Sequence, residues 1–139
     1  MKKATLIHSE ISYVIAKMGH YDAITICDAG LPIPSNVQRI DLAVTQGIPS
    51  FMDTLKAIAS EMEIESVELA EEFQKASPDL HETVTDYIAL LAKLRRKKIT
   101  TTYSNYEKFK KHTKQSLAII RTGECTPYAN ITLKSGVVF

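Results

Sequence analysis

A short β-branched stretch, Ala23 to Cys27, constrains the fold more than any other feature of the sequence. It carries no charge, and its composition predicts a buried strand. The strand must end at Cys27, because the following segment, Asp28 to Pro34, contains two prolines and a glycine that exclude regular structure. The rest of the chain must therefore supply neighbouring strands and the layers that cover them.

Predicted strands and helices alternate along the whole chain. Three helices are predicted. The first covers residues 9–18, with Ser9 as its N-cap. The second begins at Pro49-Ser50, and the third begins at Ser77-Pro78. The predicted strands cover residues 23–27, 39–44, 64–69, 99–103, 116–120 and 130–133, although the glutamates in 64–69 leave a helix open there. Ser104 and Glu107 match a capping box. We expect one layered α/β/α domain over residues 1–139, with a central sheet of five or six strands.

Charge and apolar patterning exclude several classes of protein. The chain has 17 lysine and arginine residues and 16 aspartate and glutamate residues, a net charge of +1, whereas a dedicated nucleic-acid binder needs a basic face. No apolar run approaches the roughly 18 residues of a membrane span. The apolar patch near the N-terminus is shorter than the roughly 7–15 residues of a signal peptide. We therefore expect a cytoplasmic protein whose two cysteines, Cys27 and Cys125, are reduced and buried.

Motifs for metal, phosphate and dinucleotide binding are missing from the sequence. His81-Glu82 would begin a zinc-protease helix only with a histidine at position 85, where the chain has Thr85. No Cys/His spacing supports a metal site, and no glycine-rich phosphate loop is present. We expect neither a metal nor a cofactor. The glutamates between Glu61 and Glu72 are interpreted as a solvated face.

The buried strand carries a histidine at its entrance and a carboxylate at its exit, His20 and Asp28. Ligands of open α/β sheets bind outside the carboxyl ends of strands, which is where Asp28 lies, before a loop stiffened by prolines. Five strand residues span about 17 Å, a separation that suggests a site built by two subunits. The alternatives are that His20 caps the preceding helix and that Asp28 only orders its turn.

The segment Thr126 to Asn130 is a second candidate for ligand binding. Tyr128 offers an apolar ring with a hydroxyl, and Asn130 offers a paired donor and acceptor. Together they suit a polyhydroxylated ligand. The alternative is a simple turn that leads into a strand.

Several segments together resemble the ribose pyranase and fucose mutarotase family over essentially the whole chain. They are Gly19-His20-x-Asp22, Cys27 to Pro34, Arg39-Ile40-Asp41, Thr45 to Phe51 and Gly123 to Ile131. The Gly30-Leu31-Pro32-Ile33-Pro34 continuation is more similar to the ribose branch. The resemblance implies an isomerase that interconverts the pyranose and furanose forms of free D-ribose. It also implies a ring-shaped homo-oligomer, such as a decamer, with sites at subunit interfaces.

By position, the resemblance makes His20 the catalytic acid and assigns sugar contacts to Asp28, Tyr128, Ala129 and Asn130. One position departs from the family, because Tyr106 stands where a substrate-contacting histidine is usual. Tyrosine keeps a hydroxyl but has a pKa near 10, so a sugar contact survives the exchange more easily than an acid/base role. The substrate preference at this position therefore stays open, and His112 is not assumed to replace the missing histidine.

Ring opening needs a proton removed from the anomeric hydroxyl and a proton delivered to the ring oxygen. A histidine titrates near pH 6.5 and exchanges protons in both directions at neutral pH, so His20 suits the acid. The base is Asp28 or a water that Asp28 orients. Three alternatives stay open: a fucose-type mutarotase, a non-catalytic monosaccharide-binding protein and, more distantly, a metal-dependent hydrolase.

Overall fold

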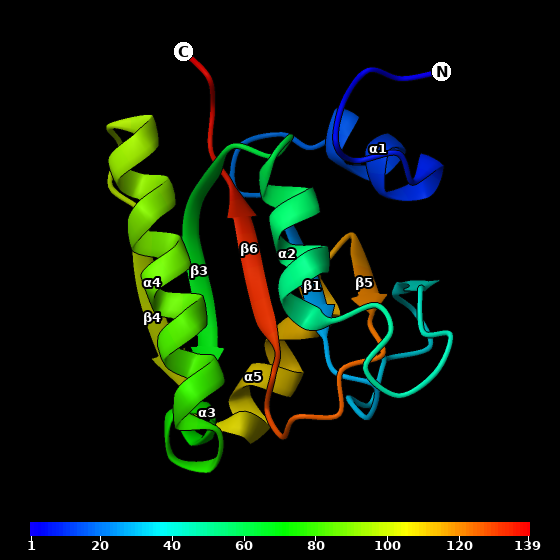
Figure 1. Cartoon of the computed structure of the whole chain (residues 1–139), viewed down its shortest axis with the longest axis vertical. Helices are drawn as coiled ribbons and strands as arrows, with labels where there is room; N and C mark the ends of the chain where they lie inside the picture. Colours follow the sequence, from blue (N-terminus) through cyan, green and yellow to red (C-terminus); the bar gives the residue numbers. More distant parts are fainter.

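The computed structural model describes residues 1–139 and contains one mixed six-stranded sheet with helices on both faces (Figure 1). In chain order the elements are α1 (Ser9–Ala16), β1 (Ala23–Cys27), β2 (Gln38–Asp41), α2 (Phe51–Ala59), β3 (Ile64–Ala70), α3 (Glu71–Ala76), α4 (Pro78–Arg95), β4 (Thr100–Ser104), α5 (Tyr106–His112), the 3-10 turn Thr113–Gln115, β5 (Ala118–Arg121) and β6 (Ile131–Ser135). The strand order is β2-β5-β1-β6-β3-β4. The predicted α/β class is confirmed.

Strand β1 lies inside the sheet, and all five of its residues are buried. It pairs in parallel with β5 and antiparallel with β6, so Ile26 faces Ile120 on one side and Ile131 on the other. Strand β6 also runs antiparallel to β3, whereas the other neighbouring strands are parallel. The carboxyl ends of five strands therefore meet at one edge, together with the start of β6.

One face of the sheet carries the larger hydrophobic core. Ile24 and Ile26 of β1 belong to a cluster that also contains Phe51 from α2 and Val84 from α4. Figure 1 shows α2 and α4 lying across the same face of the sheet. Successive strand residues point to opposite faces, which places Thr25 and the thiol of Cys27 on the other side.

The second face is covered by α5, whose Phe109 is fully buried against Cys27, Ala70 and Ile119. Burial raises the pKa of the Cys27 thiol to about 12, so this thiol stays protonated and unreactive. Both cysteines are free, as predicted. The prediction of burial was right for Cys27 and wrong for Cys125, which lies exposed in the turn before β6.

Two predicted helix starts were wrong by one residue. The N-cap of α1 is His8, whose Nδ1 accepts the Ile11 N–H at 3.4 Å, instead of Ser9. The N-cap of α5 is Asn105, which accepts the Lys108 N–H at 2.9 Å, instead of Ser104. Ser104 still belongs to β4, and its hydroxyl donates to Glu68 of the neighbouring strand β3.

The glutamate-rich segment before α4 was only partly predicted. Residues 64–69 lie in strand β3, but the short helix α3 that follows it was missed. The interpretation of the glutamates as a solvated face was wrong for Glu68, which is buried. Its Oε1 accepts the Ser104 hydroxyl at 2.5 Å and lies 2.7 Å from His112 Nδ1. These partners offset the cost of burying a carboxylate.

None of the helices combines the length and the apolar character that crossing a bilayer requires.

Replacing Phe109 by alanine should destabilise the protein by about 3–5 kcal/mol, because it leaves a cavity between α5 and the sheet. Urea unfolding followed by circular dichroism measures the change. Lys108→Ala, an exposed position one residue earlier, should stay within about 0.5 kcal/mol of the wild type. Equal stability of the two variants would contradict the packing of α5 described above.

Candidate functional site

Asp28 and Asn130 are joined at the carboxyl end of β1. Asp28 directly follows β1, and Asn130 directly precedes β6, which pairs antiparallel with β1. The Asp28 N–H donates to Asn130 Oδ1 at 3.0 Å, and Asn130 Nδ2 donates to Asp28 Oδ2 at 3.2 Å. Asn130 is fully buried and Asp28 is partly buried. This reciprocal pair holds the carboxylate at the edge of the sheet.

The surroundings of Asp28 raise the pKa of its carboxyl group. Partial burial is the largest cause, and it outweighs hydrogen bonds from the Gly30 N–H, from Asn130 and from the Leu31 N–H, which act in the opposite direction. The Gly30 N–H donates to Oδ1 at 2.9 Å. A raised pKa makes the ionised carboxylate a stronger proton acceptor than an ordinary aspartate.

Two tyrosines lie beside this carboxylate. The rings of Tyr106 and Tyr128 meet edge to face, with centroids 5.0 Å apart and an interplanar angle of 89°. Burial raises the pKa of Tyr106, and the negative charge of Asp28 raises it further, so the Tyr106 hydroxyl stays protonated at neutral pH. The residue therefore offers a hydroxyl donor next to Asp28.

The turn before β6 sets the direction of Tyr128. Its φ of 62° lies in the left-handed region, which is uncommon for residues other than glycine. The Asn130 N–H donates to the Tyr128 carbonyl at 2.8 Å, and Ala129 between them is fully buried. The segment 128–130 thus places the half-buried Tyr128 beside Tyr106, while Asn130 points toward Asp28.

Helix α5 brings Tyr106 to the site. Its first backbone N–H, that of Tyr106, donates to both carboxylate oxygens of Glu72, at 2.9 and 3.1 Å. Lys110 lies over the Tyr106 ring, with its Nζ 4.7 Å from the centroid. At the far end of α5, His112 is held by Glu68. His112 therefore anchors the helix to the sheet and is not placed beside Tyr106.

His20 lies at the opposite end of β1, in the connection from α1. Its Nε2 is 2.7 Å from Glu65 Oε2, and its ring stacks on Tyr21 with centroids 4.0 Å apart. The C-cap of α1 is Lys17, so His20 does not cap that helix. It lines a cavity of about 480 Å³ with α1 and the C-terminal residues Ser135 to Phe139.

The chain thus gathers five of the six predicted site residues and separates the sixth. The five lie together at the carboxyl end of β1, namely Asp28, Tyr106, Tyr128, Ala129 and Asn130. His20 is separated from Asp28 by the whole of β1. In Figure 1 these two ends correspond to the upper edge, with α1 and both termini, and the lower edge, with α3 and α5.

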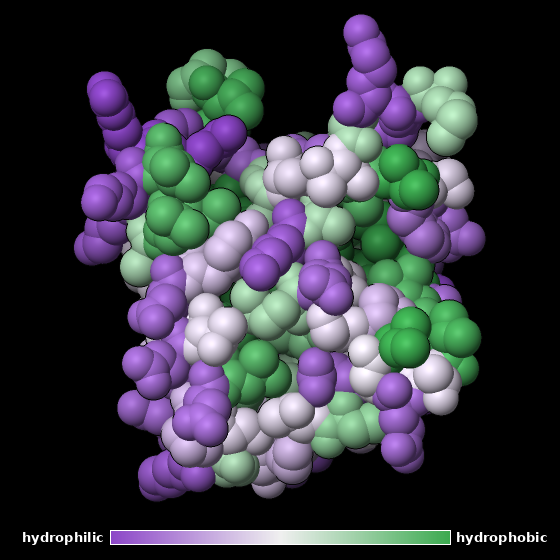
Figure 2. Space-filling model, in the orientation of Figure 1, coloured by the Kyte–Doolittle hydropathy of each residue, from purple (hydrophilic) through white to green (hydrophobic).

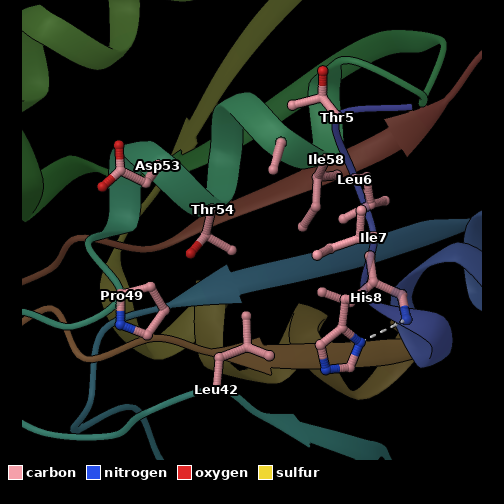
Figure 3. A pocket seen from close by; sticks show the side chains of 11 residues that line it. Thr5, Leu6, Ile7, His8, Leu42, Pro49, Asp53, Thr54 and Ile58 are labelled. Atoms are coloured by element: carbon pink, nitrogen blue, oxygen red, sulfur yellow. Dashed lines mark hydrogen bonds between the residues drawn. The ribbon is translucent and has the colours of Figure 1, made fainter. Parts of the chain in front are cut away.

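A separate apolar cavity of about 220 Å³ lies between the N-terminal segment and α2 (Figure 3). Leu6 and His8 line one side, Leu42 and Pro49 another, and Ile58 projects from α2. None of the predicted site residues contributes to it. Elsewhere in the chain, no three His, Cys, Asp or Glu side chains are grouped to hold a metal ion.

Comparison with known proteins shows the family of the chain. The model of the RbsD / FucU transport protein family matches residues 1–138. The chain belongs to this family. It is 58% identical to D-ribose pyranase from Maridesulfovibrio salexigens and 59% identical to D-ribose pyranase from Aliivibrio fischeri, each over the full length of both chains.

Solved structures of the family show the same fold. Bacillus subtilis RbsD complexed with D-ribose has a TM-score of 0.89 and 39% identity, with complete coverage of both chains. The fucose mutarotase from Streptococcus pneumoniae, in complex with L-fucose, has a TM-score of 0.79 and 27% identity, again over both complete chains. Family members of this fold therefore bind free monosaccharides.

Sequence reasoning missed two carboxylates that hold predicted site residues, Glu65 beside His20 and Glu72 beneath Tyr106. Both belong to the segment interpreted as a solvated face. Neither residue has a local motif, because each meets its partner only when segments about 34 to 45 residues apart come together. The predicted strand over residues 64–69 placed Glu65 near a strand end, but it did not reveal its partner.

Replacing Asn130 by alanine removes the acceptor for the Asp28 N–H and should cost about 1–3 kcal/mol of stability. Because the Asn130 amide lowers the pKa of Asp28, its loss should raise that pKa further. Urea unfolding and a carbon-13 NMR titration of the Asp28 carboxyl group measure the two effects. Asn36→Ala, at an exposed position, is the control and should leave both values unchanged. An unchanged Asp28 titration in Asn130→Ala would contradict the pairing.

Proposed function

We propose that this protein is an isomerase that interconverts the pyranose and furanose forms of D-ribose. The family membership and the full-length relatives named D-ribose pyranase support the reaction. The observation that carries the proposal is the cluster at the end of β1. There a carboxylate of raised pKa, a buried amide and two tyrosines present hydrogen-bonding groups around apolar rings. Such a surface suits an unphosphorylated sugar.

The chemistry requires only proton transfers. The base, which is Asp28 or a water that it orients, removes the proton of the anomeric hydroxyl. The bond between the anomeric carbon and the ring oxygen breaks, and His20 delivers a proton to that oxygen, giving the open-chain aldehyde. A different hydroxyl of the sugar then attacks the aldehyde carbon, and the protons return by the reverse route. General acid/base catalysis of this kind contributes about 10²–10⁴-fold.

The remaining residues bind and orient the sugar. Asn130 is fully buried and engaged with Asp28, so it fixes the carboxylate that faces the ligand. Tyr128 and Tyr106 frame the sugar with their rings, and the protonated Tyr106 hydroxyl donates to a sugar oxygen. Ala129 is the small, buried residue between Tyr128 and Asn130 that lets the turn pack closely.

The separation of His20 from Asp28 leads us to propose a ring-shaped homo-oligomer, such as a decamer, whose sites lie between subunits. Exposed apolar side chains support an assembly, among them Ile7, Val44, Ile48, Val138 and Phe139. Figure 2 shows hydrophobic groups interrupting the polar surface near the top and along one side of this face. The two free thiols are typical of a reducing compartment, which supports a cytoplasmic location.

A fucose-type mutarotase is the second candidate. The match to the fucose mutarotase fold supports it, and Tyr106, which stands where a histidine is usual in the family, leaves the sugar preference open. This enzyme would exchange anomers without changing the ring size. Comparing the catalysed exchange of ribose and fucose separates the two activities, because only the ribose pyranase accelerates the pyranose–furanose step.

His20→Ala should slow the exchange between ribopyranose and ribofuranose about 10²–10⁴-fold, because it removes the acid. Saturation-transfer NMR of free D-ribose with purified protein measures the rate. His8→Asn removes an imidazole but keeps a side chain that can cap α1, so this control should retain the wild-type rate. A wild-type rate in His20→Ala would refute the assigned acid. No acceleration by the wild type would instead favour a non-catalytic sugar-binding protein.

A further inference from the structure

His20 is part of a three-residue cluster with Glu65 and Tyr21. The His20 Nε2 lies 2.7 Å from Glu65 Oε2, and the two side chains are 44% and 38% exposed. The Tyr21 ring stacks on the imidazole at 4.0 Å with an interplanar angle of 21°. Interaction with the Glu65 carboxylate raises the pKa of the Tyr21 hydroxyl. One carboxylate from β3 thus interacts with two neighbouring residues of the α1–β1 connection.

The backbone of the α1–β1 connection places His20 and Tyr21 in the stacked arrangement. Tyr21 has a φ of 67°, in the left-handed region that few non-glycine residues adopt. Hydrogen bonds hold the turn on both sides: the Tyr21 N–H donates to the Ser135 carbonyl at 2.9 Å, and the Gly19 N–H donates to Asp22 Oδ2 at 2.8 Å. A conformation of this kind persists only where its surroundings determine it, and such positions cluster at functional sites.

We propose that Glu65 is a positioning residue for His20 and that Tyr21 completes the arrangement. This inference rests on the proposed function, in which His20 is the acid. Glu65 accepts the Nε2–H of the imidazole, which leaves Nδ1 as the nitrogen that exchanges a proton with the sugar. In the forward step the Nδ1–H bond breaks and the proton passes to the ring oxygen. The imidazole becomes neutral and keeps its Nε2–H on Glu65.

The other charged groups near His20 are occupied elsewhere. Glu63 is paired with Arg95 and lies 3.6 Å from Lys97, while Glu61 is paired with Lys2 at 3.1 Å.

Asp22, the carboxylate of the α1–β1 connection itself, accepts the Gly19 N–H and does not contact His20. Hydrogen bonds from His20 and Tyr21 hold the pKa of Glu65 below its usual range, and Lys97 adds a smaller effect in the same direction. Glu65 is therefore ionised throughout the neutral range, and it is the one carboxylate in contact with the imidazole.

The proposal predicts a specific effect on the rate constant. Glu65→Gln keeps the shape of the side chain but removes the charge that holds the Nε2–H of His20, so the imidazole is no longer fixed with Nδ1 toward the sugar. The maximal rate should therefore fall about tenfold, a part of the ~10²–10⁴-fold available to the acid, while the KM for ribose stays unchanged. Glu65→Asp keeps the charge on a shorter side chain, so it should recover most of the lost rate.

The experiment measures ribose ring exchange by saturation-transfer NMR over a series of ribose concentrations for the wild type, Glu65→Gln, Glu65→Asp and Glu10→Gln. Glu10 is an exposed carboxylate on α1, so its variant controls for the loss of one negative charge. Thermal unfolding of each variant shows whether the fold survives. A merely structural role of Glu65 would lower the melting temperature of Glu65→Gln without lowering the maximal rate of the folded enzyme, and this result would overturn the proposal.

A double variant separates this inference from the proposed function. If His20 is the acid and Glu65 acts through it, Glu65→Gln should cause no further loss in the His20→Ala background. Fully active His20→Ala refutes the proposed function itself. Inactive His20→Ala together with a wild-type maximal rate in Glu65→Gln refutes only the role of Glu65. An equal loss from Glu65→Gln in both backgrounds refutes it as well.

Discussion

The reciprocal hydrogen bonds between Asp28 and Asn130 are the contact on which the rest of the site depends. They form because β6 runs antiparallel to β1, so that the end of one strand meets the start of the other. A parallel neighbour would have placed a different strand end there. The same pairing aligns the turn that carries Tyr128. Because β6 is the one antiparallel strand of the sheet, a carboxylate, an amide and an aromatic ring lie together at the end of β1.

Helix α5 covers the second face of the sheet and carries Tyr106, and polar contacts attach this helix to the sheet. Phe109 supplies the apolar contact, while two glutamates hold the ends of the helix, Glu72 at the first N–H and Glu68 at His112. A helix of seven residues has little stability of its own, so these contacts decide where it lies. Tyr106 is therefore placed by residues that are far from it in the sequence.

The sequence predicted the strands well, because their burial depends on local patterns. Ala23 to Cys27 is buried as its composition indicates, and Asp28 follows it at the sheet edge. The errors arose where long-range contacts override local preference. Ser104 has the sequence of a cap but donates to the buried Glu68, and Asn105 caps α5 in its place. Glu65 could not be assigned a role, since its partner His20 lies 45 residues away.

The central claim is that the acid and the sugar-binding cluster of one site come from different subunits. Mixing two inactive variants, His20→Ala and Asp28→Asn, after unfolding and refolding them together tests it most directly. Random mixing in a symmetric ring would pair an intact His20 with an intact Asp28 at about a quarter of the interfaces. We expect ribose ring exchange to return in the mixture at about that fraction of the wild-type rate. A refolded mixture that assembles like the wild type but stays inactive would contradict the shared site.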